Sequence, residues 1–225
     1  MAFWSLLSPG LGSIKQDRTL KAFIMIIWGI VVNINAKINL SIVYSFTGQF
    51  ELAKKVIDTR WLLLYLAVYI YSVWDGFRGT VDINKLYLLA DQEDAPLHPF
   101  TIKTLDINYL DKRNPWVGAA WSALMPGLGY LYLHKVLTGI FMVVWSIVVI
   151  YFSHFLQAVH FTLVGDFDQA KAILDMQWFL FLPSTYSFVI YDCYVTAVEY
   201  NKLFEKEQSK YLRDQYQAAN FKMPL

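Results

Sequence analysis

The composition of this 225-residue chain excludes an ordinary soluble domain and a nucleic-acid-binding protein. Charged residues make up 16% and hydrophobic residues 56% of the chain, and its net charge is +1. A soluble domain contains about a quarter charged residues, and nucleic-acid binding usually requires a clustered basic face. The single cysteine, Cys193, excludes an internal disulfide and a cysteine-based zinc site. The composition therefore predicts a membrane protein that has the lipid bilayer as a partner.

The chain begins with an apolar stretch, residues 2–14, that is too short to cross a bilayer. It lacks a basic lead and a small-residue cleavage signal, so we expect no removable signal peptide. The Pro9-Gly10 pair interrupts it, and PGLG is typical of a sharp turn because glycine tolerates unusual backbone angles and proline lacks an amide hydrogen. Irregular backbone survives at membrane depth only where protein shields it. Residues 2–7 are therefore predicted to form a half-helix that dips into the membrane or lies at its surface.

The first full span is predicted over residues 20–34, continuing past Lys37 toward residue 46. A bilayer core of ~30 Å requires about 20 helical residues, and this stretch is long enough. The outer part of the span is polar, with Asn33, Asn35, Lys37 and Asn39. We favour the outer interface or a helix–helix seam for these residues over an ion pathway.

Residues 48–61 carry apolar side chains at helical spacing, which predicts a short amphipathic helix on the membrane surface. Trp61 stands where an aromatic residue would anchor the returning helix at the interface. The second span is predicted over residues 61–80. A polar linker of extended character follows, with two nearby prolines, one short ordered piece around residues 100–110 and no convincing strand.

The same order of elements then occurs again. SPGLG at residues 8–12 returns as MPGLG at residues 125–129, and a gapless shift of 117 residues also aligns Trp4 with Trp121. Roughly a third of the paired positions are identical, which indicates a tandem duplication. The second repeat is predicted to contain a half-helix (116–125), a first span (136–155, continuing to 163), an amphipathic helix (165–178) and a second span (178–198). The predicted fold class is an all-α integral membrane protein of two parallel repeats.

Lysine and arginine residues gather in the tails and the central linker, and the two hairpin loops hold few of them. The positive-inside rule therefore places both termini and the linker in the cytoplasm of a multi-pass cell-membrane protein. A rival topology, with the PGLG segments as full spans, would export Lys15, Arg18 and Lys21, and we reject it. The predicted organisation is membrane repeat one (1–86), a cytoplasmic linker (87–115), membrane repeat two (116–205) and a cytoplasmic tail (206–225).

The PGLG turns resemble those of a known membrane family. The residues that define the two turns are Pro9, Gly10, Gly12, Pro126, Gly127 and Gly129. The repeat unit resembles the bacterial branch of the two-transmembrane-helix (TM-two) domain family, whose motif runs PGLGQ-x-Y-x-G. The second repeat matches better, with Tyr132 and then Gly139 in the following helix, whereas Lys15 and Ala22 occupy these positions in the first. The glutamine is absent from both repeats, where Ser13 and Tyr130 occur. The resemblance implies a membrane hairpin and no reaction.

No enzyme is predicted. The four histidines, His98, His134, His154 and His160, do not form a ligand cluster, and lone histidines are usually structural. The acidic residues Asp166, Asp168 and Asp175 are expected to be solvated in a loop rather than to bind a cation. No phosphate-binding loop follows a strand. We therefore predict no catalytic residue, no cofactor and no metal.

Two intramembrane acids are the strongest candidate functional residues. Counting from Trp61 and Trp178, fourteen residues at ~1.5 Å each place Asp75 and Asp192 about 21 Å inward, within the inner third of the core. A carboxylate there is costly without a partner. One hypothesis is that each Asp fastens its span to the turn of its own repeat. The candidate cations are Lys21 or Arg18 for Asp75 and Lys135 for Asp192. The alternative is that each Asp merely reaches the cytoplasmic interface.

Two classes of function remain open. The first is a structural, scaffold or accessory membrane protein whose cytoplasmic linker and tail bind a protein partner. The second is a small transporter or channel that uses Asp75 and Asp192 and, because four spans are few, assembles as a homo-oligomer. Few charged residues lie deep in the spans, which disfavours transport.

Overall fold

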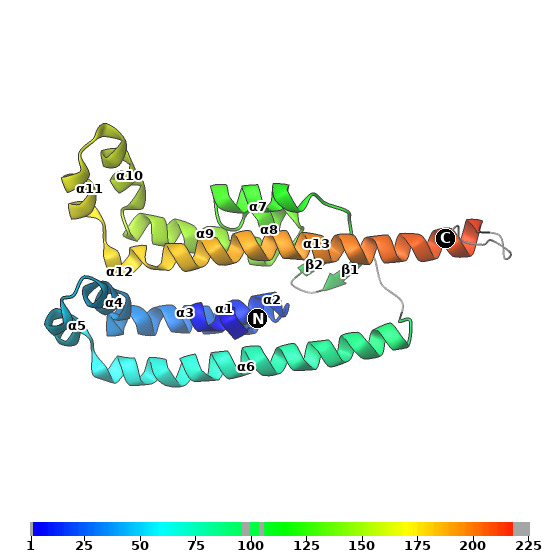
Figure 1. The fold of residues 1–225 in the computed structure, drawn as a ribbon, viewed down its shortest axis with the longest axis horizontal. Helices are drawn as coiled ribbons and strands as arrows, with labels where there is room; N and C mark the ends of the chain where they lie inside the picture. The colour runs from blue at the N-terminus through cyan, green and yellow to red at the C-terminus, as the bar shows by residue number, and fades with distance from the viewer. Residues whose placement is uncertain (1, 96–99, 104–105, 218–225) are drawn as a thin grey trace.

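The computed structural model describes residues 2–95, 100–103 and 106–217. Over these ranges the regular secondary structure is helical except for one pair of short strands (Figure 1). The strands, β1 (Phe100–Lys103) and β2 (Asp106–Tyr109), pair antiparallel with Phe100 opposite Tyr109. The sequence predicted one short ordered piece here and no strand, so the hairpin is a correction. Strands of four residues are too short to show a clear alternation of apolar and polar residues in the sequence.

The helices of the first half are α1 (Ala2–Leu7), α2 (Leu11–Lys15), α3 (Thr19–Ala36), α4 (Ile38–Phe46), α5 (Phe50–Val56) and α6 (Thr59–Gln92). Those of the second half are α7 (Pro115–Leu124), α8 (Leu128–Tyr132), α9 (Val136–Phe152), α10 (Phe155–Val164), α11 (Phe167–Ile173), α12 (Met176–Phe179) and α13 (Phe181–Tyr216). The stretch expected to continue past Lys37 breaks there, because Lys37 adopts the left-handed conformation with φ of 54°. Helix α6 extends beyond the predicted second span and replaces the start of the expected linker.

Helix boundaries and backbone breaks recur between the halves at the shift of 117 residues. Helices α5 and α11 span equivalent residues, and α2 and α8 start at equivalent residues. Positive φ angles also occur in equivalent pairs, at residues 10/127, 17/134, 37/154 and 48/165. Two of these pairs, Asp17/His134 and Lys37/His154, are not glycines and differ in residue type. Because left-handed residues other than glycine are uncommon, their match in conformation does not follow from identical residues.

An aspartate caps the start of α6 and, in the second half, the start of the short helix α12 that leads into α13. The carboxylate of Asp58 accepts hydrogen bonds from the backbone N–H groups of Arg60 (2.9 Å) and Trp61 (3.2 Å). Asp175 does the same for Gln177 (2.8 Å) and Trp178 (3.3 Å). Such caps satisfy amide groups that have no partner within the helix. The caps therefore fix the point at which each chain turns back along the bundle.

Each PGLG turn lies tightly against the helix that follows it. Gly10 has φ of 91° and Gly127 has φ of 111°. A Cβ atom at Gly10 would lie 2.7 Å from the carbonyl oxygen of Ala22. One at Gly127 would lie 2.7 Å from the carbonyl oxygen of Gly139, the residue equivalent to Ala22. Both backbone angle and space therefore require glycine.

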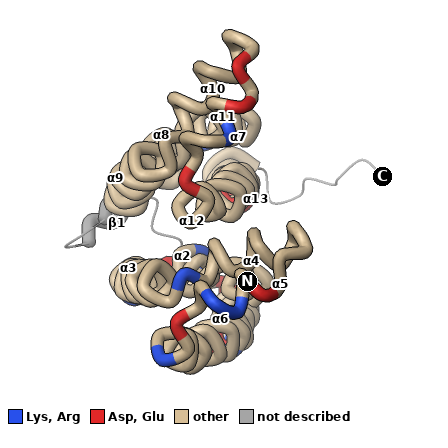
Figure 2. The backbone as a smooth tube through the Cα atoms, turned by 90° about the vertical axis from the view of Figure 1, so that its left-hand side faces the viewer, with Lys and Arg blue, Asp and Glu red and all other residues tan. Residues whose placement is uncertain are grey.

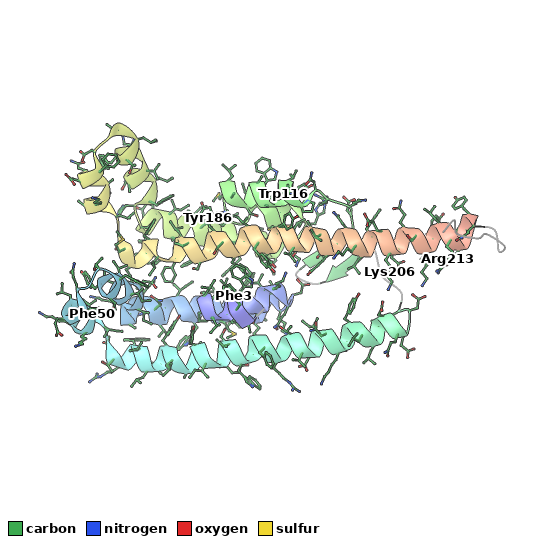
Figure 3. All side chains as sticks on the ribbon, in the orientation of Figure 1. Phe3, Phe50, Trp116, Tyr186, Lys206 and Arg213 are labelled. Atoms are coloured by element: carbon green, nitrogen blue, oxygen red, sulfur yellow. The ribbon has the colours of Figure 1, made fainter. Side chains whose placement is uncertain are left out.

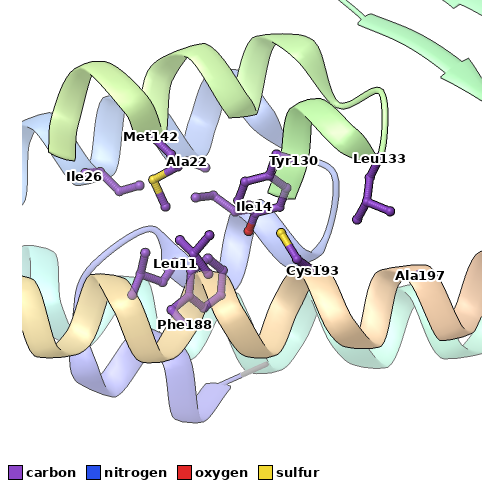
Figure 4. Packing of buried hydrophobic residues seen from close by; sticks show 11 residues of the cluster. Leu11, Ile14, Ala22, Ile26, Tyr130, Leu133, Met142, Phe188, Cys193 and Ala197 are labelled. Carbon is purple, nitrogen blue, oxygen red and sulfur yellow. The ribbon is translucent and has the colours of Figure 1, made fainter. Parts of the chain in front are cut away.

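The helices run along one long axis (Figure 1). One end of the bundle, the hairpin end, carries α4–α5 and α10–α11, and the opposite end, the linker end, carries the far ends of α6 and α13. Viewed from the hairpin end, the two halves form two adjacent groups of helices (Figure 2). Figure 4 shows the core between them, where Leu11, Ile14 and Ile26 meet Tyr130 and Phe188.

Large apolar side chains are exposed along most of the helices. They include Phe3, Ile24, Ile27, Leu63, Ile70, Phe77, Ile140, Val144 and Ile147. Among the described residues, Thr19–Ala36 alone is a single helix long and apolar enough to cross a membrane. The number rises to four if each of three bent helix pairs is one span, with bends of 88°, 57° and 83°. The length and composition of the helices are thus compatible with one to four spans.

Replacing Gly10 with alanine should destabilise the protein far more than replacing Gly165. Both glycines have φ of 91°, but a Cβ at Gly165 would meet nothing within 4 Å. Gly165→Ala should therefore cost only the left-handed backbone strain of about 1–2 kcal/mol. Gly10→Ala adds a clash with backbone, which should cost about 1–3 kcal/mol more. Thermal unfolding in detergent measures the difference, and equal losses would show that the Gly10 turn is loosely packed.

Candidate functional site

Asp192 is the most buried acid in the described chain, at 0% exposure. The hydroxyl of Tyr130 on α8 donates to its Oδ2 at 2.7 Å. The ammonium of Lys15, at the end of α2, donates to its Oδ1 at 3.2 Å. Both carboxylate oxygens are therefore satisfied, and one partner comes from each half of the chain. A buried charge is tolerated only with this kind of pairing.

Asp75 occupies the equivalent position on α6 but has a different environment. Lys21 Nζ lies 2.5 Å from Asp75 Oδ1, and Arg18 Nη1 lies 3.9 Å from the same atom. Asp75 Oδ2 is buried and has no hydrogen-bond partner among the described residues. Lys21 and Arg18 are the two cations that the sequence named as candidates, and both belong to the same half as Asp75. The carboxylate of Asp75 is thus paired within its own half through Oδ1, and its Oδ2 has no partner among the described residues.

The expected pairing of Asp192 with Lys135 is wrong. Lys135 donates a hydrogen bond to Asp17 Oδ1 at 2.7 Å, and the cation at Asp192 is Lys15. Burial opposes the charge on Lys135, but Asp17 and the neighbouring Tyr200 and Asp192 hold its pKa above the ordinary value. Both ion pairs therefore connect the two halves, whereas the sequence predicted a contact within one repeat. The reason is that α2 of the first half packs beside α13 of the second.

The first turn is also held by a residue other than Asp75, which was expected to fasten it. The Gly10 N–H donates to Ser72 Oγ at 3.1 Å, one helical turn before Asp75. Gln16 Nε2 donates to the carbonyl of Gly76 at 2.8 Å. The turn is therefore fastened to α6 by neutral hydrogen bonds. The remaining turn residues, Pro9, Gly12, Pro126 and Gly129, are all buried.

A second connection between the halves lies toward the hairpin end. Gln177 Nε2 donates to Asn33 Oδ1 at 2.9 Å, and Gln177 Oε1 accepts from the Leu40 N–H at 2.8 Å. Asn33 Nδ2 donates to Asn39 Oδ1 at 3.1 Å, and Asn39 Nδ2 donates to the Gln177 carbonyl at 2.9 Å. The glutamine thereby inserts into the break between α3 and α4. Asn33 and Asn39 lie in this packed seam, whereas Asn35 is exposed and bonds only to Val31 of its own helix.

A cavity of about 340 Å³ lies beside this amide network. Its polar lining includes Ser8, Asn33, Asn39, Tyr65 and Tyr69, and the rest is mostly apolar. Neither Asp75 nor Asp192 lines it. The cavity and the ion pairs are therefore separate features.

The other residues singled out from the sequence do not assemble into a chemical site. His154 contacts Gln157, and His160 packs on Phe161, while His98 lies outside the described residues. Asp166 and Asp175 cap helices α11 and α12. Over the described ranges, no group of three His, Cys, Asp or Glu residues could hold a metal ion.

Comparison with known proteins identifies no relative of this chain. No family model matches the chain, and neither the curated proteins nor the solved structures contain a match. The resemblance to the TM-two family therefore depends on the motif residues alone.

Sequence reasoning missed Tyr130, Asp17 and Gln177, and it left Lys15 without a role. Lys15 and Tyr130 are both departures from the TM-two motif, at its tyrosine and glutamine positions respectively. Those two departures were the available signal, because Lys15 and Tyr130 both contact Asp192. Nothing in the sequence marked Gln177, whose equivalent in the first repeat is Arg60.

Removing one member of the Lys15–Asp192 pair should destabilise the protein more than removing both. Lys15→Met leaves a buried carboxylate with too few donors and should lower the free energy of unfolding by about 3–5 kcal/mol. Adding Asp192→Leu removes that charge and should restore part of the loss. Lys54→Met, which breaks the exposed pair with Glu51, should cost about 1 kcal/mol or less. Denaturant titration in mixed micelles measures all three, and a Lys15→Met loss no larger than that of Lys54→Met would refute the fastening role.

Proposed function

We propose that this chain is a polytopic membrane protein of structural, scaffold or accessory type. It consists of two tandem parallel repeats, each with a half-helix, a PGLG turn and two spans joined by an amphipathic helix. Ion pairs between the repeats hold them as one unit in the bilayer. The linker and tail face the cytoplasm and bind a protein partner, and the chain itself catalyses no reaction.

The membrane assignment is supported by the exposed apolar surface and by the broken helices. Soluble monomers rarely expose large contiguous apolar patches, yet apolar side chains are exposed on α1, α3, α6, α7 and α9. The half-helices α1 and α7 and the turns after them pack against the long helices of their own halves, which shields their irregular backbone. Such shielding is what the bilayer requires.

The scaffold assignment rests on the length of α6 and α13. These helices have 34 and 36 residues, so they measure ~51 Å and ~54 Å, well beyond a ~30 Å core. Their far ends, residues 81–92 and 199–216, form what we call the stalk. Figure 3 shows Lys206 and Arg213 toward the far end of α13.

Charges hold the two sides of the stalk together. Lys206 pairs with Asp91 and Lys210 with Asp94, both at 2.7 Å. The hydrogen bond from Lys210 lowers the pKa of Asp94, and the bond to Asp94 raises the pKa of Lys210. The pair is therefore charged on both sides at neutral pH. It is lost as pH falls through the lowered pKa of Asp94 or rises through the raised pKa of Lys210.

The stalk also exposes apolar side chains that lie beyond the bilayer core. Leu86, Tyr87, Leu88, Leu89, Tyr211, Leu212 and Tyr216 are all at least about half exposed. Tyr87 follows Trp61 by ~39 Å of helix. Exposed apolar groups outside the hydrocarbon are typical of a protein-binding surface. This is the observation that carries the partner-binding proposal.

The alternative, an oligomeric transporter or channel that uses Asp75 and Asp192, has less support. Each carboxylate is ion-paired within the chain, and this pairing disfavours a role in carrying a cation or a proton. The 340 Å³ cavity is the feature that would favour transport, and its lining includes neither acid.

Cysteine labelling tests the proposed topology. In a Cys193→Ser background, single cysteines replace Gln49, Asp94, Gln169 and Gln215. An impermeant thiol reagent on intact cells should label the positions at Gln49 and Gln169 only, because the hairpin ends face outward. Labelling of Asp94→Cys from outside would refute the topology.

Photo-crosslinking in native membranes tests partner binding. Benzoylphenylalanine at Tyr211 should give discrete protein adducts, and the same group at Tyr151 should not, because Tyr151 is proposed to face lipid. The two tyrosines are both well exposed, at 59% and 73%. Equal adduct patterns at the two positions, or no protein adduct at Tyr211, would contradict a partner-binding stalk.

A further inference from the structure

The contact between the two halves pairs two distinct apolar faces. The covering face, on the first half, consists of Trp4, Leu11, Phe23, Ile26 and Ile30. The covered face, on the second half, consists of Phe141, Met142, Trp145, Thr185, Phe188 and Tyr191. Trp4 packs against both Phe188 and Tyr191 with ring centroids 5.2 Å apart, and Phe23 stacks on Phe141 at 3.9 Å. Leu11, Ile26 and Ile30 face Met142, Trp145 and Thr185.

The first half carries its own version of the covered face, and no other described part of the chain covers it. An open groove of about 300 Å³ is lined by Ile24, Met25, Trp28, Ala67, Val68 and Tyr71. At the shift of 117 residues, these six correspond in order to Phe141, Met142, Trp145, Ser184, Thr185 and Phe188. Trp74, equivalent to Tyr191, extends the groove and is 59% exposed. The groove therefore matches the covered face residue by residue.

The second half carries an unused version of the covering face. The residues equivalent to Trp4, Leu11, Phe23, Ile26 and Ile30 are Trp121, Leu128, Ile140, Val143 and Ile147. All five are apolar, and all are partly or fully exposed. Trp121 is 46% exposed, although the equivalent Trp4 packs on two aromatic rings. Each chain thus presents one unfilled groove and one unused face that would fill it.

We propose that a second copy of this chain docks head-to-tail, with its α7–α9 face in the groove between α3 and α6. Trp121 of one copy then packs against Tyr71 and Trp74 of the next, as Trp4 packs against Phe188 and Tyr191 within the chain. The occupant is a second copy because the contact between the halves already shows that these two kinds of face fit together. Such a contact is heterologous, so repetition gives a closed ring or an open row.

The unpartnered oxygen of Asp75 is a second, independent observation. At the contact within the chain, Asp192 receives Lys15 from the covering half. The residue equivalent to Lys15 is Tyr132, and docking brings its hydroxyl to the side of Asp75, whose buried Oδ2 lacks a partner among the described residues. A phenol O–H can donate to a carboxylate. This hydrogen bond would be the counterpart of the Lys15–Asp192 contact.

The match ends at the hairpin end. Arg60 and Leu156 occupy the positions equivalent to Gln177 and Asn39, so the copies cannot form the amide network that joins the halves. The contact between copies is therefore mostly apolar and weaker than the contact within the chain. This inference goes beyond the proposed scaffold role and does not require the stalk to bind a partner.

Thiol cross-linking between copies tests the arrangement in reconstituted liposomes. In a Cys193→Ser background, Trp74→Cys with Trp121→Cys should give a ladder beyond the dimer with a short bismaleimide. Each single variant alone should give no ladder, and a mixture of the two singles should give dimers only. The pair Leu66→Cys with Trp121→Cys is the control, since Leu66 is exposed but does not line the groove.

Two outcomes of the cross-linking would overturn the proposal. Cross-linking by a single variant as strong as by the pair would indicate a symmetric dimer, and a pair no stronger than its control would indicate a groove covered by lipid. A second measurement uses no introduced cysteine. Ala67→Trp, which fills the groove, should reduce the association between labelled copies at least tenfold. Leu66→Trp should leave association unchanged, and equal association of the two variants would contradict docking in the groove.

Discussion

The structure depends on a buried carboxylate that receives hydrogen-bond donors from both halves. Asp192 receives Tyr130 from its own half and Lys15 from the other half. A lone buried charge costs several kcal/mol, and the pairing offsets this cost only when the donors are held in place. Separation of the halves would remove the Lys15 ammonium from Asp192 and leave Tyr130 as its hydrogen-bond donor. The ion pair therefore makes the two halves one folding unit.

The PGLG turns place the donors for this pairing. Gly10 and Gly127 adopt positive φ and approach the backbone of the next helix at distances that no side chain permits. Because each turn is tight, α2 and α8 start at a fixed position, and Lys15 and Tyr130 project from them toward α13. The constraint at Gly10 thus determines the position of the Lys15 charge five residues away.

The sequence predicted the local elements well and the contacts between halves poorly. The positions of the short helices, of the glycines with positive φ and of the long helices follow from periodicity and glycine chemistry, which act over a few residues. Partners of Asp192 depend on how α2 lies against α13, and periodicity does not encode that arrangement. The expected pairing with Lys135 was wrong for this reason. The same limit applies to Gln177, which acts only because a break in another helix lies beside it.

The two halves differ in sequence where they meet. Lys15 and Tyr132 occupy equivalent positions, as do Asn39 and Leu156, and in each pair the polar or charged member serves the contact within the chain. A charge exchange tests the central claim most directly. Lys15→Asp and Asp192→Lys should each reduce the folded, monodisperse fraction of detergent-extracted protein, and the double exchange should restore most of it. Failure of the double exchange to exceed either single variant would contradict a direct pairing between the halves.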